Sequence, residues 1–271
     1  MLEKIGFNPE MAGWAAAADA TIGRVVRVDG GIARVLTEER PVRASFGGIL
    51  LAEMGIDATT GPCAGDWCVV REWPDHRITL ETVLPRRSTV VRATTDEQSG
   101  DQVLCSNIDY AAVVVALHTS PLIARVERLL TQARETGAQP LVVLTKSDTV
   151  PEADVVAAMV AEVRAATPGV EVICTSTVAG VGLRRLHELI DGHLTVALLG
   201  ASGHGKSSLI NALVGARVLT TKEIRDDGRG RHTSVRRELV VLPVGGAVID
   251  TPGMGGLGVI DAWNAGRRGA R

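Results

Sequence analysis

Cysteine is scarce in this chain of 271 residues, which contains only 4. Cys63, Cys68, Cys105 and Cys174 are too scattered to form the disulfide framework of a small secreted domain. Cys63 and Cys68 also have no downstream pair of Cys or His residues at the spacing of a zinc site. We therefore expect small buried thiols, with no disulfide and no zinc.

Long apolar runs and an export signal are missing too. Apolar runs such as residues 111–117 are much shorter than the roughly 18 residues that a membrane helix needs. The amino terminus carries Glu3, Lys4 and Glu10 where an export signal would be apolar. Hydrophobic residues make up 45% and charged residues 22%, which excludes a disordered or collagen-like chain. The sequence predicts a globular cytoplasmic protein that does not enter a membrane.

Lysine is rare, because only 4 of the 29 basic residues are lysines. Two of them, Lys146 and Lys206, lie in the motifs described below. A slender ammonium fits between phosphates where a planar guanidinium does not. The basic residues are concentrated late in the chain, where residues 201–271 hold 11 basic against 6 acidic residues, a formal charge of +5. This cluster fits the phosphates of RNA or nucleotide, and a solvated polar loop equally well.

Hydrophobic patterning divides the chain into two parts. Five short β segments are predicted at residues 21–29, 32–36, 42–46, 66–72 and 78–84. Gly30-Gly31 forms a hairpin signal between the first two. These segments suit a closed OB-type barrel over residues 21–92, although an SH3-like barrel has a similar pattern. Residues 1–20 form an amino-terminal extension, and residues 94–101 read as a polar linker.

Residues 93–258 change to an alternation of strands and helices, followed by a short tail over 259–271. Continuous apolar strands are predicted at 111–117, 141–144, 170–174, 194–199, 239–242 and 247–249, with helices between the first four. Such strands indicate a mainly parallel sheet with helices on both faces. The predicted fold is therefore an OB-type β-barrel followed by an α/β domain.

The most specific motif of the sequence lies at residues 200–207, between a predicted strand and a predicted helix. It reads Gly200, Ala201, Ser202, Gly203, His204, Gly205, Lys206 and Ser207, and Ser208 follows it. This pattern is the P-loop, in which backbone amides and the helix N-terminus hold phosphates. Lys206 is expected to reach the β- and γ-phosphate oxygens, and Ser207 to ligate Mg²⁺. The competing interpretation is a glycine-rich turn.

A second motif, Thr145-Lys146-Ser147-Asp148, ends another predicted strand. The Asp148 carboxylate can accept two hydrogen bonds from guanine, while adenine offers neither, so the motif favours GTP over ATP. Lys146 is expected to lie along the base. Ser176, in the triplet 175–177 after the next strand, is expected to lie near the guanine O6. The alternatives are ordinary polar turns at both places and, for the whole chain, a P-loop ATPase.

The third motif, Asp250-Thr-Pro-Gly253, follows the last predicted strand and matches DxxG. Asp250 is expected to hold Mg²⁺ through water, and the Gly253 amide to meet the γ-phosphate. Between this motif and the P-loop, residues 228–234 form a basic segment that contains His232 and Thr233. Thr233 is a candidate Mg²⁺ ligand, while a lone histidine in a polar loop is more often simply solvated.

The order of these motifs differs from that of a Ras-like chain, because the guanine motifs precede the P-loop. This order indicates a circularly permuted GTPase domain, with the original termini joined around residues 191–194. Together with Gly65-Asp66-Trp67, residues 84–88 and Asn107-Ile108-Asp109, the motifs resemble the circularly permuted GTPases that depend on the small ribosomal subunit, the RsgA or YjeQ family. The resemblance covers about residues 20–258.

The resemblance implies a role in late maturation of the 30S subunit, with GTP hydrolysis stimulated by that particle, so the 30S subunit and its rRNA are the expected partners. It also implies that His232 positions the attacking water and that Thr233 is the switch threonine. Together with Lys206 of the P-loop, these residues form the predicted catalytic set. Met254 stands where Ras-like enzymes carry a water-orienting glutamine, so slow intrinsic turnover is expected. Such proteins normally continue into a helical domain with a zinc site, whereas this sequence stops after the short tail. Thr145 replaces the commoner asparagine, which is expected to weaken tethering of the P-loop.

The leading hypothesis is therefore a monomeric GTPase that binds GTP or GDP with Mg²⁺ and docks on the 30S subunit through its barrel and basic segment. The rival is a GTP-binding RNA module with little catalysis, because the carboxyl-terminal domain is missing.

Overall fold

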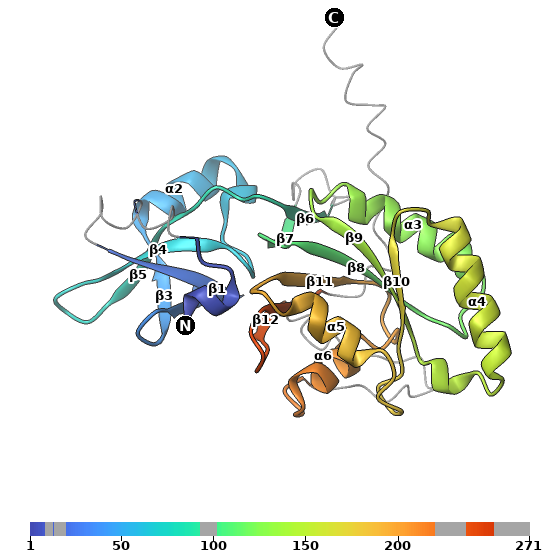
Figure 1. The fold of residues 1–271 in the computed structure, drawn as a ribbon. Coiled ribbons are helices and arrows are strands. Elements are labelled where there is room, and N and C mark those ends of the chain that lie inside the picture. Colours follow the sequence, from blue (N-terminus) through green and yellow to red (C-terminus); the bar gives the residue numbers. More distant parts are fainter. Residues whose placement is uncertain (9–12, 14–19, 93–101, 220–236, 252–271) are drawn as a thin grey trace, which may run out of the picture.

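The computed structural model describes residues 1–8, 13, 20–92, 102–219 and 237–251. The predicted linker at 94–101, the predicted site residues His232, Thr233 and Gly253, and the tail 259–271 lie outside the described residues. In the part that is described, no helix is both long and apolar enough to cross a bilayer. A β-barrel forms one side of the molecule, and a sheet covered by helices forms the other (Figure 1).

The amino-terminal unit is a closed barrel with the strand order β1-β2-β3-β5-β4. Its elements are β1 (Thr21–Asp29), β2 (Ile32–Thr37), β3 (Pro41–Phe46), α2 (Gly48–Ile56), the 3₁₀ turn η3 (Ala58–Thr60), β4 (Trp67–Glu72) and β5 (Ile78–Val83). The parallel pairing of β3 with β5 and the helix between β3 and β4 distinguish the OB fold from the SH3-like alternative. The predicted OB-type barrel is thus confirmed, although the sequence pattern did not indicate α2.

Strand alternation explains how the barrel fills its interior. In β2, Ala33 and Val35 are buried while Arg34 between them is exposed, and β3 repeats the pattern around Arg43. The side-chain period of two therefore sends apolar groups inward and arginines outward.

The second unit is a six-stranded sheet with the order β10-β9-β8-β11-β13-β12. Its strands are β8 (Tyr110–Ala116), β9 (Gln139–Thr145), β10 (Glu171–Cys174), β11 (Thr195–Leu199), β12 (Glu238–Val241) and β13 (Ala247–Asp250). Every pairing is parallel except that of β12 with β13. The mainly parallel sheet predicted from the apolar runs is therefore confirmed.

Helices cover both faces of this sheet, as predicted. They are α3 (Leu122–Arg134), α4 (Ala153–Ala166), α5 (Leu183–Ile190) and α6 (Lys206–Val214). Alternate residues of β8 enter two different hydrophobic clusters: Val113 packs with α3 and α4, while Val114 packs with α5 and α6. Both faces are thus buried, which explains why the strands are apolar at every position.

Two short strands connect the units. β6 (Thr89–Arg92) pairs with β7 (Gln102–Ser106) in a separate two-stranded sheet. The boundary expected at residues 92 and 93 therefore falls within this two-stranded sheet, which lies in sequence between the barrel and the six-stranded sheet. The amino-terminal 3₁₀ turn η1 (Leu2–Ile5) is also part of the packed structure, because Leu2 and Ile5 are buried.

One hydrophobic cluster extends from the barrel into the sheet. It contains Trp67 of β4, Ile5 of η1 and Ile249 of β13. At the same junction the buried Arg24 guanidinium donates to the carbonyls of Ile5, Gly65 at 3.3 Å and Asn107 at 3.0 Å. Burial lowers the pKa of Arg24 to about 10, an effect partly opposed by Asp109. Arg24 therefore joins three separate segments at the boundary between the two units.

The buried thiols of the barrel and of the junction are expected to be unreactive. Burial raises the pKa of Cys63 and Cys68 well above the usual thiol value, and that of Cys105 to about 12. Since the thiolate is the reactive form, at about pH 8 the native chain should react with Ellman's reagent only at the partly exposed Cys174. Mass spectrometry of the labelled chain, with and without denaturant, checks this. Rapid labelling of Cys63 or Cys105 in the native state would contradict it.

Candidate nucleotide-binding site

The phosphate-binding motif forms the loop between β11 and α6, and its glycines have individual structural reasons. A Cβ on Gly200 would lie 2.3 Å from the Val114 carbonyl oxygen, so only glycine allows the loop to leave β11 this close to β8. Gly203 and Gly205 have φ angles of 83° and 87°, in the left-handed region that favours glycine. α6 then begins at Lys206, which places a helix N-terminus behind the loop.

Lys206 is folded into the loop that precedes it. Its ammonium donates to the carbonyl oxygens of Gly200 at 2.8 Å and Ala201 at 3.0 Å, and the residue is only 7% exposed. Burial lowers the pKa of Lys206, and the nearby Asp250 carboxylate partly opposes this effect. The loop thus holds a desolvated cation, which interacts with phosphate more strongly than a hydrated one.

Ser207 and Asp250 supply adjacent oxygens of the kind that Mg²⁺ prefers. The Ser207 hydroxyl donates to Asp250 Oδ2 at 3.1 Å, and Asp250 lies at the end of β13, in register with Leu198 of β11. Burial raises the pKa of Asp250, while Lys206 and Ser207 partly oppose this. A hydroxyl and a carboxylate, completed by phosphate oxygens and water, fit the octahedral oxygen environment of Mg²⁺.

The chain after Asp250 is anchored by a contact that the sequence analysis missed. Thr251 is buried, and its hydroxyl donates to the Leu198 carbonyl at 2.6 Å. The threonine was visible within the DxxG motif, but nothing in the motif indicates that its side chain returns to the neighbouring strand.

The guanine motif and the later serine meet at the ends of β9 and β10. Lys146 has a φ of 59°, and residues Ser147–Thr149 form the 3₁₀ turn η4. Asp148 Oδ1 accepts a hydrogen bond from the Ser176 hydroxyl at 2.5 Å. The Ser147 amide also donates to the Thr175 carbonyl at 3.1 Å. The structure therefore brings Asp148 and Ser176 together, 28 positions apart in sequence.

A hydrogen bond joins the phosphate loop to the guanine loop. The Thr145 hydroxyl donates to the His204 carbonyl at 2.7 Å, across 59 positions of sequence. The His204 ring is buried, with Nδ1 3.1 Å from the Val114 carbonyl oxygen, and burial lowers the pKa of the imidazole. A tether of the P-loop is therefore present with threonine at position 145. Whether it is weaker than an asparagine tether stays a prediction.

All of these residues lie at one edge of the sheet. Thr145 ends β9, the P-loop follows β11, and Asp250 ends β13, so three strands present their carboxyl ends together. This is the edge at which open α/β sheets bind ligands. Of the predicted site, the described residues therefore include the guanine loop, the P-loop and Asp250.

Comparison with known proteins assigns the chain to a family. Residues 83–260 match the sequence profile of the RsgA GTPase family. The chain belongs to the RsgA GTPase family. The match includes the guanine motif, the P-loop and Asp250, which confirms the resemblance drawn from the motifs.

Several RsgA relatives align with most of the chain. "Small ribosomal subunit biogenesis GTPase RsgA" of Streptomyces coelicolor is 44% identical over 254 residues, covering 92% of this chain and 67% of the relative. The Streptomyces avermitilis protein of the same name is 45% identical over 245 residues, covering 89% and 64%. The chain thus spans about two thirds of the length of the curated relatives it matches.

Two solved structures share the fold. The crystal structure of YjeQ from Thermotoga maritima superposes with a TM-score of 0.64 at 22% identity, covering 89% of this chain and 77% of that one. The structure of YloQ, described as a circularly permuted GTPase, gives a TM-score of 0.59 at 21% identity, covering 89% and 74%. These likenesses confirm the barrel and the permuted GTPase fold.

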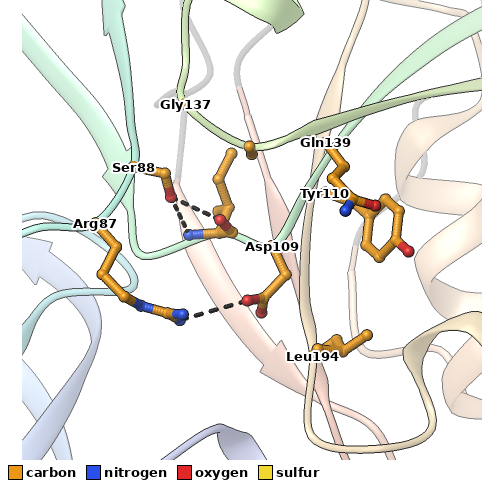
Figure 2. A pocket seen from close by; sticks show the side chains of 9 residues that line it. Arg87, Ser88, Asp109, Tyr110, Gly137, Gln139 and Leu194 are labelled. Atoms are coloured by element: carbon orange, nitrogen blue, oxygen red, sulfur yellow. Dashed lines mark hydrogen bonds and ion pairs between the residues drawn. The ribbon is translucent and has the colours of Figure 1, made fainter. Parts of the chain in front are cut away.

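A hollow of about 370 Å³ lies at the opposite edge of the RsgA sheet (Figure 2). Asp109, Tyr110, Gln139 and Leu194 line it at the amino ends of β8, β9 and β11. The Arg87 guanidinium crosses the hollow to Asp109 at 3.4 Å. Because the P-loop and the guanine loop lie at the carboxyl ends of the strands, this hollow is not part of the nucleotide site.

Proposed function

We propose that this RsgA-family chain binds GTP with Mg²⁺ and hydrolyses it while acting on the small (30S) ribosomal subunit in the cytoplasm, late in maturation of that subunit. The observation that carries the proposal is the Thr145–His204 hydrogen bond, which holds the guanine loop and the phosphate loop at one edge of the sheet. The names of the relatives, which describe biogenesis of the small ribosomal subunit, support the choice of partner.

Each end of the nucleotide has its own set of residues in this proposal. Asp148 accepts the two guanine N–H bonds, with Ser176 beside it and Lys146 along the base. The P-loop amides and Lys206 hold the phosphates, while Ser207 and Asp250 hold Mg²⁺. Thr233 and the Gly253 amide complete the triphosphate site, and His232 positions the attacking water.

The proposal is tested by measuring GTP turnover of this chain with and without purified 30S subunits. Arginine fingers and similar external activators accelerate GTPases by about 10³- to 10⁵-fold, so stimulation of at least about tenfold is expected even if activation is incomplete. Omitting Mg²⁺ should abolish turnover. Equal rates with and without 30S subunits would argue against a GTPase that this particle activates.

Guanine selection gives a separate prediction. The Asp148 carboxylate can accept hydrogen bonds from both guanine N–H groups, whereas the amide in Asp148→Asn accepts through its oxygen but donates through its nitrogen. GTP affinity should therefore fall by at least about a hundredfold. Xanthosine triphosphate, which has a carbonyl at the base position where guanine has an amine, should then bind better than GTP. Competition against a fluorescent GDP measures both affinities.

The same titration decides between the GTPase and the ATPase interpretation. The unaltered chain should prefer GTP to ATP, and Asp154→Asn, the same substitution at an exposed position of α4 outside the site, should keep that preference. Tighter binding of ATP, or an unchanged preference in the Asp148→Asn variant, would support a P-loop ATPase instead.

A further inference from the structure

Three arginines form a row on the outside of the barrel. Arg27 of β1 is directly opposite Arg34 of β2, and Arg34 is directly opposite Arg43 of β3. Adjacent strands are about 4.8 Å apart, so the three side chains start close to one another. Like charges at directly opposite positions destabilise a sheet. The row therefore costs stability at any member that has no anion beside it.

Two members of this row are available to an external anion. Arg34 and Arg43 are exposed, and neither forms an ion pair with another residue that the structure describes. The backbone of single-stranded RNA offers repeated phosphates, and the β2–β3 side of OB barrels is a common site for oligonucleotides.

The third member, Arg27, points toward the GTPase unit. β1 packs beside β12, and Arg27 Nη1 lies 3.6 Å from Glu238 Oε2 of that strand. The Arg27 side chain is only 13% exposed, and it also pairs with Asp29 at 2.5 Å. Arg27 is thus the least exposed member of the arginine row and also belongs to the contact between the barrel and β12.

Glu238 is the residue directly opposite Asp250 in the antiparallel pair of β12 and β13. Opposed residues of paired strands lie on one face of a sheet, so Glu238 and Asp250 are connected through the paired backbones of β12 and β13. Asp250 in turn accepts a hydrogen bond from Ser207. The Arg27–Glu238 ion pair and the pairing of Glu238 with Asp250 therefore connect the arginine row with the oxygens assigned to Mg²⁺.

The hairpin of β12 and β13 is also held to the amino-terminal part at its other end. The Gly246 amide, in its turn, donates to the Lys4 carbonyl at 2.6 Å. Because the turn is anchored, a displacement of Glu238 moves the opposite end of the hairpin, which carries Asp250.

We propose that Arg27 and Glu238 are positioning residues that relay the binding of RNA phosphate at the arginine row to the nucleotide site. A phosphate along the row competes with Glu238 for the Arg27 guanidinium, and release of Glu238 shifts the start of β12, which is paired with the Asp250 end of β13. By thermodynamic linkage, nucleotide and Mg²⁺ then alter the affinity of the row for RNA to the same extent. The inference depends on the proposed function, since it assumes a GTP·Mg²⁺ site and an RNA partner.

The experiment measures the affinity of the chain for fluorescent GDP with Mg²⁺, alone and with saturating 30S subunits. In the unaltered chain, 30S subunits should change this affinity by about fivefold or more. In Glu238→Gln, which keeps the size of the side chain but not its charge, the change should fall below about twofold. Arg27→Lys, which retains a cation that can serve both partners, should keep most of the effect.

A charge-swapped variant, Arg27→Glu with Glu238→Arg, separates a relay from a merely structural pair. It rebuilds the ion pair with position 238 but not the one with Asp29, so it should recover part of the thermal stability lost in Arg27→Glu; because it lacks a cation at position 27, it should not recover the coupling. The exposed pair of Arg40 and Glu72, 2.9 Å apart on the barrel, provides the control. Glu72→Gln should leave the coupling unchanged.

Three results would overturn the relay: full coupling in Glu238→Gln, recovered coupling in the swapped variant, or no effect of bound 30S subunits on GDP affinity in the unaltered chain. The last result leaves the proposed function intact if 30S subunits still stimulate hydrolysis. Failure of the chain to bind 30S subunits at all would overturn the proposed function and the relay together.

Discussion

Replacing Lys206 with alanine is expected to lower 30S-stimulated GTP turnover by about 100- to 1,000-fold, the usual cost of removing one preorganised group that stabilises the transition state. Lys206 is the buried cation of the P-loop, held by the Gly200 and Ala201 carbonyls. Its removal leaves the charge that develops on the phosphates unneutralised. Single-turnover measurements at saturating 30S subunits and varied GTP separate the effect on kcat from the effect on KM.

Lys206→Arg is the matched control, because it keeps the charge but not the shape. A planar guanidinium does not fit between the two carbonyls that the ammonium contacts, so turnover should stay low despite the retained cation. Turnover of Lys206→Ala within about tenfold of the unaltered chain would contradict a catalytic P-loop. If the unaltered chain did not hydrolyse GTP, and Lys206→Ala lost GTP but kept normal 30S binding, the rival RNA-binding module would be favoured.

The largest effect on stability is expected for Asp66→Ala, which should lower the free energy of unfolding by about 3–5 kcal/mol. Asp66 is fully buried, and its carboxylate accepts hydrogen bonds from the Cys63 amide at 2.7 Å, from the Ser106 hydroxyl, and from Arg86 through two nitrogens at 2.8 Å each. Alanine leaves the largely buried Arg86 guanidinium without its anion. Urea unfolding followed by fluorescence measures the loss.

An exposed ion pair provides the comparison for Asp66. Glu72→Ala removes the partner of Arg40, and because both side chains are about half exposed, the change should cost less than about 1 kcal/mol. Asp66 connects the barrel with Arg86 and with Ser106 of β7. Its removal should therefore also cause the barrel and the GTPase unit to unfold in two separate transitions. A single transition with a loss similar to that of Glu72→Ala would contradict a structural role for the buried pair.

Most of the fold could be predicted because its strands have distinct patterns. Barrel strands β2 and β3 alternate buried apolar residues with exposed ones, while β8 is apolar nearly throughout because helices cover both faces of the sheet. α2 was missed, since its apolar residues Ile49, Leu51 and Ile56 are largely exposed and do not mark a buried face. β6 and β7 were missed because a short hairpin around a polar stretch looks like a linker.

The candidate site was predictable in its parts but not in its assembly. Gly200, Lys206, Asp148 and Asp250 stand in local motifs whose spacing has a chemical reason. The side-chain contacts of Thr251 and His204 with neighbouring strands have no such signal, because their partners are backbone carbonyls far away in sequence. Backbone carbonyls are present at every position, so no residue type marks them as acceptors.

The spacing of the motif residues and the hydrophobic periodicity were sufficient to predict a circularly permuted GTPase domain and a β-barrel before it in the chain. Only the tertiary structure established that Thr145 reaches His204, that Arg24 joins three segments, and that Glu238 stands opposite Asp250. The physical reason is the distance in sequence between the residues that interact. A loop that wraps phosphate is determined by a few consecutive residues. The neighbours of a side chain across a sheet or between two units depend instead on register and packing, which form only when the whole chain has folded.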